Sequence, residues 1–269
     1  MGVWGLLIGA GLTAGAVLEA SAQVADVADS PCNTGPAIAG RVAKIVDGRS
    51  FVMTDGREVR IAALEVLPSA VAAGRAARDA LGSILSDQTV ALRAAGPADR
   101  YGRMVAHVNL GHTGPSAARL MLARGHARVG AQVSHAACAM DLLSQERVAR
   151  TGRLGLWGDP VYAILDAADL SGLVAVAGRF SLVEGKVLSV RESRGTIFVN
   201  FGRRWTQALT VTILKRHEGI FAGAGVAPKV LENRSVLVRG WVEFRNGPRL
   251  EASRPEQVEI AGLNQKAMP

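Results

Sequence analysis

Short apolar runs separated by turn residues open the first half of the chain. Between residues 38 and 64 the apolar positions fall into three runs, with Asp47-Gly48 and Asp55-Gly56 between them. Aspartate-glycine pairs favour hairpin turns, because glycine adopts a positive φ at no steric cost. The pattern therefore predicts a meander of three β-strands.

The residues after this meander predict one helix, two more strands and two more helices. We place the helices at 69–85, 116–124 and 135–150, and the strands at 89–93 and 104–110. Five strands with a helix between the third and the fourth have the order of a small OB-like barrel. We expect a first domain of this kind at 38–160.

A second group of strand patterns follows a connector at 161–177. The strands are predicted at 180–190, 196–201, 208–213, 235–244 and 249–260, with a helical segment at 214–222. The order is again five strands with a helical insert, so we predict a second small OB-like β-barrel at 178–262 and a tail at 263–269. The fold class is mainly β with α+β character: an OB-fold barrel with three helices, then a second barrel.

Residues 1–22 have the pattern of a secretory signal peptide. An apolar run from Val3 to Val17 precedes Ala20-Ser21-Ala22, a cleavage site with small residues at both ends. No lysine or arginine precedes the run, so an uncleaved anchor in the inner membrane or a misassigned start codon stays open. A run of roughly 15 residues is short for a membrane span. We predict a periplasmic or secreted protein with a linker at 23–37, and no integral span after signal cleavage.

The chain has only two cysteines, Cys32 and Cys138. Export would place both in an oxidising compartment, where they would form a disulfide that ties the linker to the first domain. The alternative is two unpaired thiols. The histidines have no metal-ligand spacing among themselves, so we predict no zinc site.

The charge of the chain suits a polyanionic partner. The formal net charge is +8, and lysines and arginines near phosphates release counterions on binding. Solubility, or the basic bias of exported proteins, would explain the same charge. With 49% hydrophobic and 20% charged residues the composition excludes wholesale disorder.

Aromatic residues gather in the second domain, interleaved with arginines. Phe198, Phe201, Trp205, Trp241 and Phe244 all fall there. Aromatic platforms beside cations bind single-stranded nucleic acids in OB folds, so Trp205 with Arg203 and Arg204 is a candidate binding surface. The alternative is that these aromatic residues fill a small β core.

Three ordered motifs carry a family resemblance. They are Asp47-Gly48-Arg49-Ser50, Val59-Arg60-Ile61 and Asp99-Arg100-Tyr101-Gly102-Arg103. Together they resemble the thermonuclease (staphylococcal nuclease) family, whose signatures are D-G-D-T, V-R-L-x-G-I-D-x-P-E and D-x-Y-G-R. The resemblance spans about residues 38–160. It implies a nuclease scheme in which carboxylates hold calcium, a glutamate activates water and two arginines neutralise the phosphate.

The resemblance places Arg60 and Arg103 on the two phosphate-binding arginines, with Tyr101 and Arg49 beside them as further candidates for phosphate contact. Arg49 replaces a metal-binding aspartate, which leaves Glu65 as the one candidate metal ligand. Pro68, or Ser69 if a residue has been inserted, takes the position of the catalytic glutamate, and neither can act as a general base. Asp99 more simply caps its own loop.

These residues predict an exported, nucleic-acid-binding protein whose phosphodiester hydrolysis is weak or lost. DNA or RNA is the expected partner and no cofactor is expected. Two alternatives remain. One is a catalytically dead structural or protein-interaction module, as in tudor-associated nuclease-like domains, and the other is an active calcium-dependent nuclease.

Overall fold

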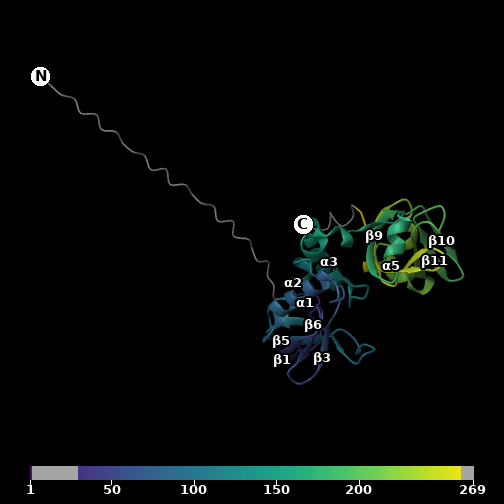
Figure 1. Ribbon diagram of the computed structural model, residues 1–269. Coiled ribbons are helices and arrows are strands. Elements are labelled where there is room, and N and C mark those ends of the chain that lie inside the picture. Colours follow the sequence, from purple (N-terminus) through teal and green to yellow (C-terminus); the bar gives the residue numbers. More distant parts are fainter. Residues whose placement is uncertain (2–29, 262–269) are drawn as a thin grey trace.

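Five strands form a closed barrel in the first half of the chain (Figure 1). They are β1 (Ile38–Ile45), β2 (Ser50–Met53), β3 (Glu58–Ile61), β5 (Thr89–Ala94) and β6 (Met104–Leu110), in the order β1-β2-β3-β6-β5. β1 pairs with β5 through its first half and with β2 through its second half, and an irregularity between Val42 and Lys44 bends it. β3 and β6 run parallel. The predicted OB-like barrel is confirmed. The computed structural model describes Met1 and residues 30–261.

Three helices cover this barrel, as predicted. They are α1 (Ala72–Leu85), α2 (Ala117–Ala123) and α3 (Ala136–Thr151), and a short pair of strands, β4 (Leu64–Glu65) and β7 (Arg128–Val129), lies beside them. Alternation along β2 turns Phe51 and Met53 inward, where they join Leu81 of α1 and Leu142 of α3 in one buried core. Two 3-10 helices, η1 (Gly155–Gly158) and η2 (Pro160–Tyr162), end this half of the chain.

The second half of the chain forms a β domain of similar strand order. Its strands are β9 (Phe180–Lys186), β10 (Ser189–Ser193), β11 (Thr196–Asn200), β12 (Thr210–Leu214), β13 (Ser235–Phe244) and β14 (Pro248–Glu251), in the order β10-β11-β12-β14-β13-β9. β12 and β14 run parallel. Between them lie η3 (Lys215–His217), α5 (Glu218–Gly223) and η4 (Pro228–Leu231).

The bend between β9 and β10 joins the two ends of this second sheet. Only Val187 and Leu188 separate the strands, and the Val187 N–H donates to the Arg234 carbonyl while the Leu188 N–H donates to the Asn200 carbonyl. One continuous segment therefore pairs with β13 at one end and with β11 at the other. In the first barrel β1 likewise pairs with two strands, β5 and β2. The strand predicted at 180–190 is in fact this bent pair.

Two further sequence predictions need revision. The strand predicted at 249–260 is interrupted: β14 ends at Glu251, and η5 (Pro255–Gln257) precedes β15 (Val258–Ile260), which pairs with β13. Pro255 has no N–H to donate to a sheet, and the Gln257 side chain accepts from the backbone N–H of Ser253 at 2.8 Å. The segment 161–177, predicted as a connector, contains β8 (Leu165–Asp166) and α4 (Leu170–Ala175), which pack on the second core. The domain boundaries themselves stay predictions.

A buried ion cluster holds the two halves together. The guanidinium of Arg239, on β13, donates from Nη1 to Glu146 Oε2 of α3 at 2.8 Å and from Nη2 to Glu259. Burial alone would lower the pKa of Arg239, but the two carboxylates outweigh it and raise the pKa above its ordinary value. Because all three side chains are buried and charged, each depends on the others.

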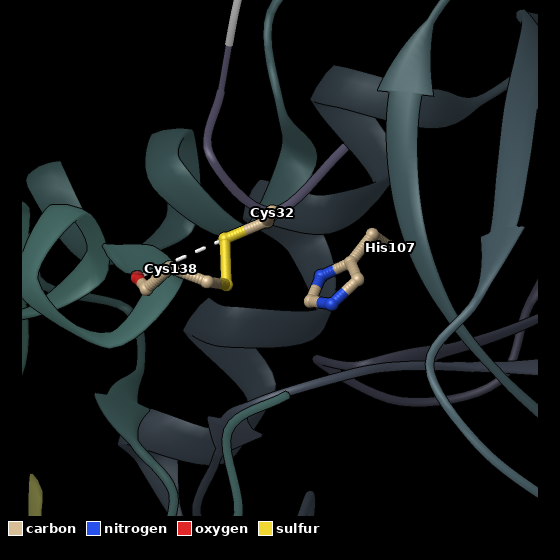
Figure 2. Close-up of side chains that lie close together, drawn as sticks. All are labelled: Cys32, His107 and Cys138. Carbon is tan, nitrogen blue, oxygen red and sulfur yellow. Dashed lines mark hydrogen bonds between the residues drawn. A yellow bond between two sulfur atoms is a disulfide. The ribbon is translucent and has the colours of Figure 1, made fainter. Parts of the chain in front are cut away.

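A disulfide between Cys32 and Cys138 ties the segment before β1 to α3, and the buried ring of His107 lies beside it (Figure 2). This is the pairing expected for an oxidising compartment. The predicted signal peptide, apart from Met1, falls outside the described residues, as do residues 23–29 and the tail. Within residues 30–261 no helix is long and apolar enough to cross a membrane.

Candidate phosphate-binding site

β3 and the start of β6 place two arginines at one end of the barrel. Arg60 lies on β3, opposite Ser50 of β2, and shares a face with Glu58 two residues earlier. Arg103 directly precedes β6, which pairs with β3, and its guanidinium lies 3.8 Å from Glu58. The structure thus brings together the two arginines that the sequence resemblance marked for phosphate.

The loop before β6 fixes the orientation of Arg103. Asp99 accepts from the backbone N–H of Tyr101 at 2.9 Å and of Arg103 at 3.1 Å, and its Oδ2 lies 2.7 Å from Arg103 Nη2. The hydrogen bond from the Arg103 side chain lowers the pKa of Asp99 to about 2. Tyr101 is 66% exposed, with the guanidinium of Arg103 5.2 Å from its ring centre. Asp99 therefore caps the loop and holds Arg103, as the sequence suggested.

Arg49, which the resemblance puts in place of a metal-binding aspartate, is bonded at both its backbone and its side chain. Its backbone N–H donates to Asp47 at 2.8 Å, which fixes the turn between β1 and β2. Its side-chain Nη1 donates to Glu65 Oε2 at 2.7 Å and to the Leu64 carbonyl at 3.0 Å. One carboxylate and one carbonyl, both oxygen donors of the kind that bind a metal, are thereby bonded to an arginine.

The oxygen donors at this position are a poor match for calcium. Calcium takes six to eight oxygen ligands, most of them from carboxylates and carbonyls. Glu65 is engaged by Arg49, and Asp47 uses one oxygen on its own turn. Among residues 30–261 the one group of three side chains close enough to hold a metal is Cys32, His107 and Cys138, and the disulfide removes both thiolates from it.

Arg60 differs from its two arginine neighbours in having no acidic partner within the described residues. Arg49 is paired with Glu65 and Arg103 with Asp99. Burial has the largest effect on the pKa of Arg60 and lowers it, and repulsion from Arg49 lowers it further. Attraction by Glu65 only partly offsets these two effects. A half-buried cation that is repelled by its neighbours favours an anion beside it, because buried charges require a compensating partner.

The family comparison supports this geometry. Residues 60–159 match the family model of the staphylococcal nuclease homologues, a stretch that contains both Arg60 and Arg103. This barrel domain belongs to that family. The nuclease-like domain therefore has a nucleic-acid-binding fold. Asp47 and Arg49 lie before the matched residues. No curated protein matches the sequence.

No general base is evident where the nuclease scheme would require one. Pro68 and Ser69 line a pocket beside the nuclease-like site, and the only carboxylates among the residues that line it are Asp47 and Glu65. Glu65 is held by Arg49, and Asp99 lies on the other side of Arg103 with a pKa far too low for a base that works near neutral pH.

The predicted surface around Trp205 is built differently from the expectation. Trp205 is 52% exposed on the loop between β11 and β12 and lines a pocket of about 420 Å³. Arg203 and Arg204 are exposed on the same loop, but the arginines that line the pocket come from other segments. These are Arg191, Arg245 and Arg249, with Phe198 beside them. Only the folded sheet brings them together.

Local sequence patterns do not predict the contacts by which the second domain approaches the nuclease-like site. Arg128, on β7, donates to the carbonyls of Phe180 and Tyr162, both at 3.0 Å. Arg179 and Trp241 line the same pocket as Arg49 and Glu65. None of these contacts follows from a motif with local spacing, so only the packing of the two domains reveals them.

Proposed function

We propose that this is an exported protein that binds nucleic acid through the nuclease-like domain and hydrolyses phosphodiesters weakly or not at all. The observation that carries the proposal is the bond between Arg49 and Glu65. It removes the remaining acidic ligand and adds a cation to a site that already holds Arg60 and Arg103. Planar guanidinium groups match the geometry of phosphate oxygens, so this arrangement favours binding.

The missing groups account for most of the chemistry of such an enzyme. General acid-base catalysis contributes on the order of a hundred- to ten-thousand-fold, and a metal ion further stabilises the charge that develops on the phosphate. A site without either retains the electrostatic attraction and loses the activated water. Phosphate binding should therefore persist where cleavage does not.

Export is supported by two features of the chain. The pattern of residues 1–22 is that of a signal peptide, and the joined cysteines suit an oxidising compartment. A direct check is mass spectrometry of the protein purified from the periplasm. A mature N-terminus near residue 23 is the expected result, and a full-length protein recovered with the membrane fraction would contradict cleavage.

Binding can be tested by fluorescence anisotropy with labelled single-stranded DNA over a range of salt concentrations. We expect the affinity of the wild-type protein to fall as the salt concentration rises. Arg60→Ala should weaken binding and reduce the slope of log affinity against log salt by about the amount due to one phosphate contact. Arg57→Ala is the matched control, because Arg57 is an arginine of the same hairpin that is bonded to Asp55. An affinity independent of salt would favour a protein-interaction module instead.

Cleavage is tested separately with the same DNA and calcium, at protein concentrations at which an active thermonuclease digests it completely. We expect intact DNA. Calcium-dependent cleavage that Arg60→Ala abolishes would overturn the proposed loss of hydrolysis and restore the third alternative, an active calcium nuclease.

A further inference from the structure

A pocket of about 590 Å³ lies between the two domains, directly beside the Arg49–Glu65 pair. The nuclease-like domain contributes the loop after β4, including Leu67, Pro68 and Val71. The other wall includes Arg179 and Phe180 at the start of β9 and Trp241 of β13. The second domain thus adds a wall to one side of the nuclease-like site and forms a partly open pocket, of a size typical for small-molecule ligands.

The pocket has an excess of positive charge. Three arginines line it, Arg49, Arg128 and Arg179, against the carboxylates of Asp47 and Glu65. Glu65 is already paired with Arg49, and Arg179 is exposed with no ion pair within the described residues. An anionic group entering the pocket would meet this excess without displacing an existing pair.

Arg128 strengthens this argument, because it is a buried cation without a carboxylate partner. It is 7% exposed, its hydrogen bonds go to two backbone carbonyls, and its Nε has no partner within the described residues. Burial lowers the pKa of Arg128, and Glu146, the acid that opposes this most strongly, is bonded to Arg239. Buried charges are normally compensated, so an anion in the adjoining pocket would relieve an existing cost.

The opposite wall of the pocket is aromatic. Trp241 is 51% exposed, and its ring lies edge-to-face with that of Phe180 at a centroid distance of 6.3 Å. Phe180 is buried and packs against the indole, so the exposed part of Trp241 offers an aromatic surface to a flat ring. Stacking of a nucleic-acid base on such a surface contributes about 1–3 kcal/mol and is independent of sequence.

We propose that this interdomain pocket binds a single nucleotide, with its phosphate toward the arginines and its base stacked on Trp241. The inference rests on the proposed function of the nuclease-like domain and extends it, because the second domain supplies the base-binding wall. Such a nucleotide is either free in solution or the end of a strand. Both sources present the same chemistry to the pocket.

The test measures binding of adenosine 5′-monophosphate to the full protein by isothermal titration calorimetry, with ribose 5-phosphate as the ligand without a base. We expect the nucleotide to bind and Trp241→Ala to weaken its binding by about 5- to 150-fold, the equivalent of one lost stack. Trp241→Phe should restore most of this loss. Phe244→Ala is the matched control, because this aromatic residue of the same strand is exposed to nearly the same extent, at 49%, but does not line the pocket.

Competition with DNA then distinguishes the two sources of the nucleotide. If a linear, 5′-phosphorylated oligonucleotide displaces the nucleotide and a circular strand does not, the pocket takes strand ends; if neither displaces it, the pocket takes free nucleotides. Equal displacement by the circular strand, or equal binding of ribose 5-phosphate, would overturn the inference. If Trp241→Ala binds the nucleotide as the wild type does while Arg60→Ala binds DNA more weakly, the proposed pocket is wrong and the proposed function stands. If Arg60→Ala binds DNA as the wild type does, the proposed function is refuted.

Discussion

Replacing Arg239 by methionine should destabilise the whole protein, because it removes the nearest cation from two buried carboxylates and leaves them only the longer contacts with Arg147 and Arg150. The side chains of Arg239 and Glu146 are each 1% exposed and that of Glu259 is 9% exposed. Removing one partner from a buried ion pair costs about 3–5 kcal/mol, since the remaining charge can neither be solvated nor compensated. For a chain of this size each kcal/mol lowers the melting temperature by about 2–4 °C, so we expect a decrease of about 6–20 °C.

The assay is thermal unfolding followed by circular dichroism at pH 7, with a triple variant as the control. In Arg239→Met with Glu146→Gln and Glu259→Gln none of the three charges of this cluster remains, and the melting temperature should recover most of the loss. A single variant whose stability stays within about 1 kcal/mol of the wild type would refute the reasoning, because it would mean that water reaches these carboxylates.

The pH dependence of this difference follows from Glu259. Burial alone would raise the pKa of Glu259, but the charges of Arg239 and Arg150 hold the pKa below its ordinary value. A carboxyl group with a lowered pKa contributes stability above its unfolded value of about 4.3 and loses it as the pH falls further. The difference in the free energy of unfolding between the wild type and Arg239→Met should therefore become smaller below about pH 4. A gap that widens there would contradict the assignment.

Three further predictions concern other parts of the molecule. Replacing Cys32 and Cys138 by serine, which opens a loop with a sequence separation of 106, should cost about 2–5 kcal/mol in urea unfolding, and a loss below 1 kcal/mol would contradict the cross-link. Burial lowers the pKa of His107 to about 4, so unfolding should become easier by about 3 kcal/mol between pH 6.5 and 4, and His107→Gln should abolish this slope. Arg49→Asp should create weak calcium binding, with a dissociation constant of about 10⁻⁴–10⁻³ M, seen as a calcium-dependent rise in melting temperature that the wild type lacks.

The sequence was sufficient to predict most of the fold, because the relevant signals are local. The two aspartate-glycine turns lie where β1, β2 and β3 reverse direction, and β13 coincides with the strand predicted at 235–244. Local signals failed where a side chain interrupts an apolar pattern. Gln257 bonds to the backbone before η5, and this contact, with Pro255, breaks a segment whose alternation is typical of one long strand.

The candidate site was only partly predictable. The motifs place Arg60, Arg103, Arg49 and Glu65 at one end of the barrel, but they do not show that Arg49 bonds to Glu65 across 16 positions of chain. The contact from Arg128 to Phe180 spans 52 positions and crosses between domains. Contacts at such separations depend on how two surfaces pack, and no periodicity within either surface encodes them.

Arg49 also determines whether phosphate binding at this site depends on a supply of metal ions. A bound metal ion is exchanged with the surroundings, so a site that depends on one follows the supply of that ion. A guanidinium attached to the turn between β1 and β2 is always at full occupancy. Its charge survives a chelator and does not depend on the calcium concentration around the protein. The attraction for phosphate would then be constitutive, set by ionic strength and by the amount of protein present.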